Sequence, residues 1–271
     1  MSVRIGNLSV LHHQSNNEAT LTLADYRASA NELKRTQDLL DLIPTMGSTA
    51  LDIGARDGHF SILLAERFSD VIALDLTLPN IIHPKIRCIQ GNAANLKFAD
   101  NSFDIVLCAE VLEHIPPNIL ENVCSEMERV CRKHLVIGVP YRQDIRVGRT
   151  TCYTCMEKNP PWSHVNTFDE KRLDLLFPNC KTSQTSFVGI NRDRTNALSA
   201  ALMDMAGNPY GTYSQEEPCI HCGKPLKPPP DRDIKQKILT RLAFWSRQAT
   251  SAFEQPTANW IHRLLIKTGA G

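Results

Sequence analysis

The chain has 271 residues, of which 42% are hydrophobic and 22% charged, and its formal net charge is +1. This length allows one good core with appendages, and the near-neutral charge argues against a nucleic-acid binder. No apolar run is long enough to span a bilayer, and we expect no signal region at residues 1–14. Nine cysteines, some in strand-like runs (Cys88, Cys108), favour a reducing cytoplasm over a disulfide framework.

Leucines among charged residues predict a helix within residues 24–43, ending before Pro44. From Thr49 to Pro140 strand-like and helix-like patterns then alternate, which indicates crossover units and a mainly parallel sheet. Ligands of such sheets bind at the carboxyl ends of the strands. The predicted strands are Ala50–Gly54, Val71–Asp75, Ile86–Gln90, Phe103–Ala109 and His134–Val139, and the clearest helices are Phe60–Phe68 and Ile119–Arg132.

After Pro140 the sequence changes character, with two cysteine pairs and several proline breaks. A helix at 168–177 and a strand at Lys181–Ile190 continue the core, and a further helix is expected at 195–206. We therefore divide the chain into an N-terminal helical cap (1–48), a core with an insertion (49–190, insertion 141–165), a segment with the second cysteine pair (191–230) and a basic amphipathic helical tail (231–271).

Polar residues follow four successive predicted strands. The first strand enters a Gly-containing turn (Asp52 to Phe60) and then a helix, so backbone N–H groups and the positive helix end meet there and favour an anionic or carboxylate-bearing ligand. Asp75 ends the second strand, where a carboxylate can accept both hydroxyls of a ribose. Asn92 and Glu110 follow the third and fourth strands. Together they would line one crevice.

The order and spacing of these residues resemble class I S-adenosylmethionine-dependent methyltransferases of the broad small-molecule type, well over residues 30–140 and more loosely to about 190. The resemblance implies an α/β, Rossmann-like, doubly wound and mainly parallel seven-stranded sheet with helices on both faces. It also implies methyl transfer from S-adenosylmethionine to O, N or C of an acceptor. Carried over by position, Asp52, Gly54 and Gly58 surround the methionine part of the cofactor, Asp75 binds the ribose, Asn92 and Ala93 border the adenine, and Glu110 lies near the methionine end.

Two residues depart from that family pattern. Arg56 replaces the middle glycine of the turn, and Asn92 replaces the usual aspartate but can still bond to adenine. A nicotinamide dinucleotide enzyme is the rival of the same architecture, but its fingerprint fails because Arg56 and His59 occupy two of the glycine positions. A non-catalytic binding protein that kept the fold is the alternative that Arg56 favours.

Two histidines are candidate catalytic bases, needed only if the acceptor must lose a proton. His114 follows the fourth strand, and His164 lies after the fifth. The alternative for each is a histidine that packs or caps a loop. The acceptor is not readable from the sequence, but a small molecule, a glycan or a lipid intermediate is favoured over nucleic acid, because the catalytic region carries no basic stripe.

Two Cys-x-x-Cys motifs, Cys152 to Cys155 and Cys219 to Cys222, predict a structural zinc site with four thiolates. Such a site would tie the insertion to the C-terminal region. A redox pair, free thiols, two half-sites and a zinc-dependent nucleic-acid module are the alternatives, and His221 and His164 are reserve ligands.

The tail combines apolar and basic residues. Ile234, Ile238, Leu242 and Trp245 recur at helical spacing, and Trp260 to Leu265 repeats the pattern. A basic amphipathic helix with Trp can lie on an anionic membrane, so we weigh a peripheral location at the inner membrane surface against packing on the chain itself or on a partner. The sequence leaves the oligomeric state open.

Overall fold

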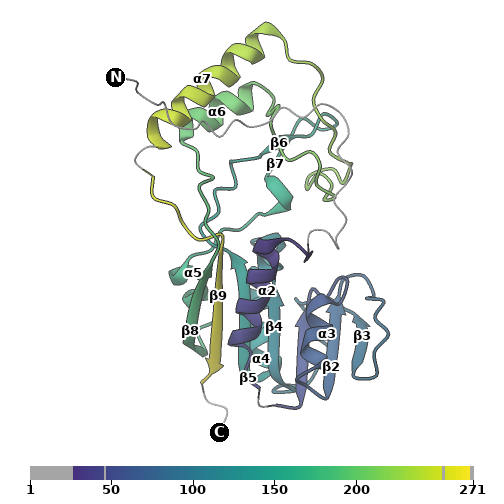
Figure 1. Cartoon of the computed structure of the whole chain (residues 1–271). Coiled ribbons are helices and arrows are strands. Elements are labelled where there is room, and N and C mark those ends of the chain that lie inside the picture. Colours follow the sequence, from purple (N-terminus) through teal and green to yellow (C-terminus); the bar gives the residue numbers. More distant parts are fainter. Residues whose placement is uncertain (1–26, 46, 252–253, 269–271) are drawn as a thin grey trace.

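The computed structural model describes residues 27–45, 47–251 and 254–268, and the expectations for residues 1–26 lie outside them. One seven-stranded sheet forms the centre of the molecule (Figure 1). β9 is antiparallel to both of its neighbours, and the other strands all run parallel to one another. In spatial order the strands are β3 (Ile86–Gln90), β2 (Asp70–Asp75), β1 (Thr49–Ile53), β4 (Phe103–Ala109), β5 (Cys131–Pro140), β9 (Trp260–Lys267) and β8 (Cys180–Val188).

Helices cover both faces of this sheet, which confirms the α/β prediction. One core cluster joins the sheet to α2 (Ala30–Leu42) and α3 (His59–Ala65), and the other joins it to α4 (Leu120–Val130) and α5 (Glu170–Leu176). The inner strands β1, β2 and β4 are buried on both faces, as is usual for parallel sheets. The helices contribute Leu39, Leu64, Val123, Met127 and Leu173 to these clusters.

The predicted core strands agree with the structure, and β3 and β4 have the predicted bounds. The predicted helix Ile119–Arg132 ends earlier, because β5 begins at Cys131 and takes its last residues. This difference is of the size expected where a helix leads into a strand without a glycine or proline between them.

The prediction of a helix over Trp260 to Leu265 is wrong. These residues belong to β9, which lies between β5 and β8 inside the sheet. The run Trp260–Lys267 is short and five of its eight residues are apolar, and periodicity alone does not separate such a run from a buried helix. His262 and Arg263 interrupt it, but both are buried and paired with acidic residues. The C-terminal segment is therefore part of the core.

A second layer lies over the carboxyl ends of the parallel strands, and we call it the cap region (Figure 1). It consists of residues 141–165, 191–251 and 254–259. Its elements are β6 (Thr150–Thr151), β7 (Lys158–Asn159), η2 (Pro161–Ser163), α6 (Ala197–Met205) and α7 (Ile234–Ser251), and η1 (Leu112–His114) faces it from the core.

Within the cap, α6 and α7 pack side by side. Asn196, the N-cap of α6, donates from its amide to the Ser246 carbonyl at 2.8 Å. Among the described residues, no helix has the length and apolar character needed to cross a membrane.

Candidate functional site

The turn after β1 is built so closely that two of its positions require glycine. Gly54 and Gly58 have φ values of +78° and +82°. A Cβ on Gly54 would lie 2.3 Å from Val111 Cγ2, and one on Gly58 would lie 2.4 Å from Ile81 Cδ1. The Gly54 N–H donates to the Leu74 carbonyl at 2.8 Å, so the turn is tied to the end of β2. Its backbone can therefore lie against a ligand at the carboxyl edge of the sheet.

Arg56 takes the conformation of the glycine that it replaces, with φ at +45°. Its backbone N–H donates to Asp75 Oδ2 at 3.0 Å. Its guanidinium forms an ion pair with Glu216 of the cap region at 2.9 Å. The substitution thus preserves the turn and adds a contact between the turn and the cap.

Asp75 and Asn92 stand at the ends of adjacent strands. Asp75 Oδ1 also accepts from the Thr77 N–H at 3.2 Å, and its carbonyl accepts from Gly91 at 2.8 Å. The exposed Asn92 uses its side-chain oxygen to cap Ala94 N at 2.9 Å, while Ala93 is buried. The ends of β2 and β3 therefore present a carboxylate and an amide on one edge.

Asp52 lies beneath the turn rather than at its surface. Only 3% of it is exposed, and its Oδ2 accepts from Ser61 Oγ at 2.6 Å. Burial raises the pKa of this carboxyl to about 6, although the Ser61 hydrogen bond opposes the shift. Asp52 thus connects the turn to α3.

Glu110 ends β4 and has a left-handed φ of +58°. Its Oε1 lies 3.6 Å from Arg35 Nη1, and its Oε2 accepts from Trp260 Nε1 at 3.3 Å. Burial raises the pKa of Glu110, and the neighbouring Arg35 opposes this. The sequence analysis missed Arg35 and Trp260 at this site. Both come from elements that only the tertiary fold brings to β4.

His114 and His164 meet although they are far apart in the sequence. Their ring centroids are 4.7 Å apart and the rings are nearly perpendicular. Burial lowers the pKa of His114, and it lowers the pKa of His164 to about 3, so the His164 imidazole is a weak base. Glu113 stands beside them with its side chain fully buried.

The four cysteines of the two motifs form one cluster. Cys152 Sγ lies 3.7 Å from Cys222 Sγ, and Cys155 Sγ lies 3.6 Å from Cys219 Sγ. All four sulfurs lie within 4.8 Å of one another. His221 is bonded to the Lys158 carbonyl instead, so neither reserve histidine belongs to this cluster.

The two cysteine motifs share one backbone geometry. The residue four positions after the first cysteine, Met156 or Gly223, has positive φ and donates its N–H to the carbonyl of that cysteine. The bond is 2.7 Å long from Met156 to Cys152 and 2.8 Å from Gly223 to Cys219. Each motif is thus a tight turn that points two sulfurs to the same side.

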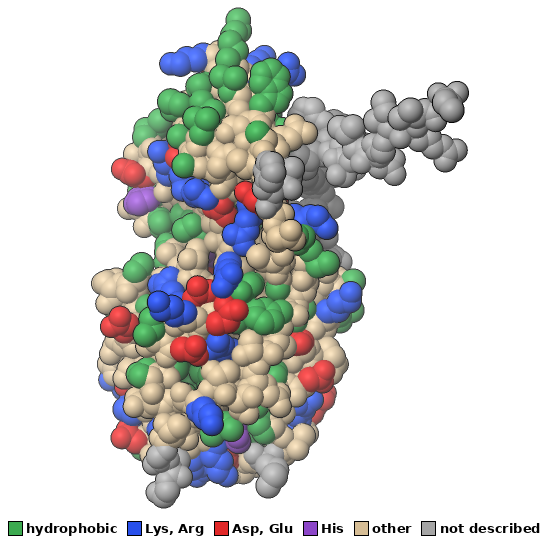
Figure 2. Space-filling view, turned by 90° about the vertical axis from the view of Figure 1, so that its left-hand side faces the viewer, with side chains coloured by type: hydrophobic (Ala, Val, Ile, Leu, Met, Phe, Trp, Pro, Cys, Tyr) green, Lys and Arg blue, Asp and Glu red, His purple; other side chains and the backbone are tan. Residues whose placement is uncertain are grey.

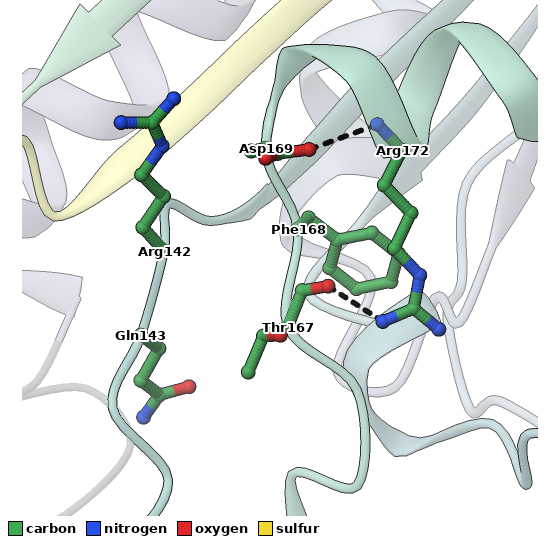
Figure 3. Close-up of a pocket in the computed structure, with 6 residues that line it drawn as sticks. All are labelled: Arg142, Gln143, Thr167, Phe168, Asp169 and Arg172. Atoms are coloured by element: carbon green, nitrogen blue, oxygen red, sulfur yellow. Dashed lines mark hydrogen bonds between the residues drawn. The ribbon is translucent and has the colours of Figure 1, made fainter.

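A polar cavity of about 410 Å³ lies beyond the end of β5 (Figure 3). Two facing segments line it, which contribute residues 142–143 on one side and residues 167–169 with Arg172 on the other. Gln143 also contacts His164, so the cavity adjoins the histidine pair. Arg172 is held in place by the Thr167 carbonyl at 2.6 Å.

Comparison with known proteins relates part of this chain to methyltransferases. A family model described as a methyltransferase domain matches residues 51–137. The YcgJ protein of Bacillus subtilis shares the fold, with a TM-score of 0.50 and 15% identity over 87% of this chain and 98% of that one. The N-methyltransferase NodS of Bradyrhizobium japonicum does so with a TM-score of 0.50 and 14% identity over 89% and 99%. Residues 51–137 thus match a methyltransferase domain, and the fold is the one found in these two structures.

The curated relatives match only part of this chain. An uncharacterized methyltransferase of Mycobacterium bovis is 30% identical over 114 residues, which are 40% of this chain and 45% of the relative. The demethylmenaquinone methyltransferase of Renibacterium salmoninarum is 35% identical over 100 residues, 35% of this chain and 40% of that protein. The chain thus spans less than half the length of these two relatives.

Proposed function

We propose that this chain transfers a methyl group from S-adenosylmethionine to O, N or C of a small-molecule, glycan or lipid-linked acceptor. The observation that carries the proposal is the arrangement of Asp75, Asn92 and Glu110 at three strand ends around the Gly54 turn, within the segment that matches the methyltransferase domain. One of the relatives named above is a demethylmenaquinone methyltransferase, and the acceptor in its name is a small molecule. Nucleic acid is not the expected acceptor.

The residues at this edge fit the cofactor by their chemistry. We assign the methionine part to the backbone of Gly54 and Gly58, with Asp52 supporting the turn from below. We assign the ribose hydroxyls to Asp75, whose carboxylate already receives backbone N–H groups on the protein side. The adenine would lie between Asn92, Ala93 and the exposed Leu76, which offers an apolar surface to a flat base. Glu110 would lie near the methionine end.

The transfer itself is an in-line displacement. The lone pair of the acceptor attacks the methyl carbon, the carbon–sulfur bond breaks with its electron pair going to sulfur, and the sulfonium becomes a neutral thioether. An acceptor O–H or N–H also releases its proton, which the candidate base His114 or a water molecule would take up. Because the donor is already activated, the protein mainly positions both partners and excludes water. We assign the histidine pair, His114 and His164, to the acceptor side of the cofactor, and the cavity beside Gln143 would admit the acceptor.

Calorimetry with S-adenosylhomocysteine tests the cofactor proposal. We expect binding to the wild type, and at least tenfold weaker binding to Asp75→Ala, because charge-assisted hydrogen bonds to the ribose are lost. Asp100→Ala removes an exposed aspartate away from the strand ends and should leave the affinity unchanged. A wild-type protein that does not bind would favour the non-catalytic alternative. Arg56 itself no longer argues for that alternative, since it keeps the conformation of a glycine.

The four-cysteine cluster supports a structural zinc. A tetrahedral zinc with bonds of about 2.3 Å holds its sulfurs about 3.8 Å apart. The two shortest described pairs, at 3.6 and 3.7 Å, match that spacing. We expect Cys152→Ser with Cys155→Ser to lose one zinc per chain in metal analysis. An unchanged zinc content would contradict this assignment.

We also propose that α7 rests on an anionic lipid surface. Its stripe, Ile234, Ile238, Leu242 and Trp245, is exposed, while Ala243 and Thr240 on another face are buried. Figure 2 shows hydrophobic side chains gathered at the top of the molecule, with Lys and Arg side chains among them. Lys235, Lys237 and Arg241 are exposed on the same helix. Apolar contact beside cations is the pattern of interfacial helices.

Vesicle co-sedimentation tests the lipid proposal. The wild type should sediment with vesicles that contain phosphatidylserine, and Trp245→Glu should remain in the supernatant. Leu175→Glu places the same charge on the exposed face of α5 and should sediment like the wild type. Equal behaviour of the two variants would contradict a role for α7.

A further inference from the structure

Three potential metal ligands that are assigned neither to the cofactor nor to the four-cysteine cluster lie together between the core and the cap region. Glu113, His114 and His164 each offer one ligand atom, and these atoms lie within 4.8 Å of one another. Glu113 and His114 come from η1, and His164 directly follows η2. Two imidazoles and one carboxylate form the donor set that divalent transition metals commonly use in sites with open coordination positions.

The Glu113 carboxyl group is buried without a hydrogen-bonding partner in the described structure. Its side chain is fully buried, and neither of its oxygens has a hydrogen-bonding partner there. Buried polar groups in proteins are almost always paired, and an orphaned carboxylate is especially unfavourable. A cation between Glu113 and the two histidines would satisfy both oxygens.

Each histidine also has a second partner that orients it. Gln143 Oε1 lies 2.6 Å from His164 Nδ1, which leaves Nε2 as the nitrogen with a free lone pair. The His114 ring lies edge-on to the His164 ring, with 4.7 Å between the ring centroids, and this contact limits its orientation. Metal-binding histidines usually donate their other ring N–H to an oxygen, as His164 does to Gln143, which fixes the tautomer and the ring orientation.

Hydrogen bonds join the two segments that carry the potential ligands. Asn166 donates from Nδ2 to the carbonyls of Leu112 at 3.0 Å and Ile115 at 2.6 Å. The Val165 N–H donates to the Glu113 carbonyl at 2.8 Å. Trp162, just before His164, has a left-handed φ of +58°, a strained conformation for a bulky residue. The chain thus holds His164 against η1 at some conformational cost.

We propose that Glu113, His114 and His164 bind a divalent transition-metal ion. Three protein ligands leave coordination positions open, and the cavity beside Gln143 adjoins them. An oxygen of the methyl acceptor is the ligand class that would complete the coordination and be held for attack. The proposal that these residues bind a metal does not depend on the proposed methyl transfer. The proposal that the metal holds the methyl acceptor does rest on it. The site is chemically distinct from the four-thiolate cluster, because it offers nitrogen and oxygen donors.

Zinc content after equilibrium dialysis tests the site. Zinc is a suitable probe, because a nitrogen and oxygen site binds it more tightly than iron or manganese. We expect Glu113→Gln and His164→Gln each to hold one zinc per chain fewer than the wild type. His134→Gln, which changes a histidine at the opposite end of β5, should match the wild type. The comparison needs no assumption about the four-cysteine site, because that site is intact in all three variants.

Two further measurements keep the outcome clear. Glu113→Gln preserves size, and far-UV circular dichroism establishes that each variant is folded. Gln143→Leu removes the partner of His164 and should weaken zinc affinity about 10- to 100-fold. Equal zinc content in the wild type and in folded Glu113→Gln and His164→Gln would overturn the proposal. Failure of S-adenosylhomocysteine to bind would leave these zinc counts unchanged, so the two proposals fail separately.

Discussion

Substitution of Gly54 by alanine should destabilise the protein by an amount that the structure divides into two parts. The φ of +78° places the residue in the left-handed region, which costs an L-residue about 1–2 kcal/mol. The new Cβ would also lie 2.3 Å from Val111 Cγ2, and overpacking of this kind costs about 1–3 kcal/mol. We therefore expect the free energy of unfolding to fall by about 2–5 kcal/mol in urea denaturation.

A double-mutant cycle and a control separate these parts. Val111→Ala removes the methyl that Gly54→Ala would meet, so the double variant should recover about 1–3 kcal/mol relative to the sum of the single effects. Gly223→Ala has a similar φ of +67° with nothing within 4 Å, so it should show the backbone cost alone. The reasoning would be refuted if Gly54→Ala cost no more than Gly223→Ala, or if Val111→Ala gave no recovery.

Three further predictions concern acidity, zinc and the turn. Because the folded-state pKa of Asp52 is raised to about 6, its ionisation opposes folding as pH rises from about 4 to 6. Asp52→Asn should therefore gain about 2–3 kcal/mol relative to wild type between pH 4 and pH 7 in urea unfolding, and a pH-independent difference would contradict this. Removal of zinc by a chelator should lower Tm and expose residues 150–230 to cleavage by trypsin. Cys152→Ser should have the same two effects without a chelator. Equal cleavage rates with and without zinc would count against a structural zinc. Arg56→Ala removes an exposed ion pair with Glu216, so it should lower the free energy of unfolding by under about 1 kcal/mol. It should also leave the affinity for S-adenosylhomocysteine unchanged. A large loss of affinity in calorimetry would assign the guanidinium to the cofactor site.

Local sequence patterns were sufficient for the parallel core. The strand-like runs at Ile86–Gln90 and Phe103–Ala109 are strands with those bounds, because a short run between polar turns can be recognised without distant information. β9 could not be recognised in the same way, since its neighbours β5 and β8 are remote in sequence and decide its state. Local patterns therefore predict a helical tail over 231–271, although its last part, Trp260–Lys267, is an interior strand of the sheet.

Local sequence patterns likewise predict part of the candidate functional site and miss the rest. The two Cys-x-x-Cys motifs that begin at Cys152 and Cys219 form one cluster, as predicted. Two cysteine pairs at this fixed spacing can be recognised from the sequence alone. Arg35 and Trp260 at Glu110 were missed, since each is a common residue on an element that only folding brings near. The pairing of His114 with His164 depends in turn on a loop held by side-chain hydrogen bonds, which no periodicity records.

The most direct test of the central claim is a crystal structure of the protein with S-adenosylhomocysteine. The account predicts density at the carboxyl ends of β1, β2 and β3, with the ribose hydroxyls on the Asp75 carboxylate and the adenine beside Asn92. The homocysteine part should follow the Gly54 turn towards Glu110. Clear density for the ligand elsewhere, or a crevice that stays empty at saturating ligand, would contradict the assignment of this site.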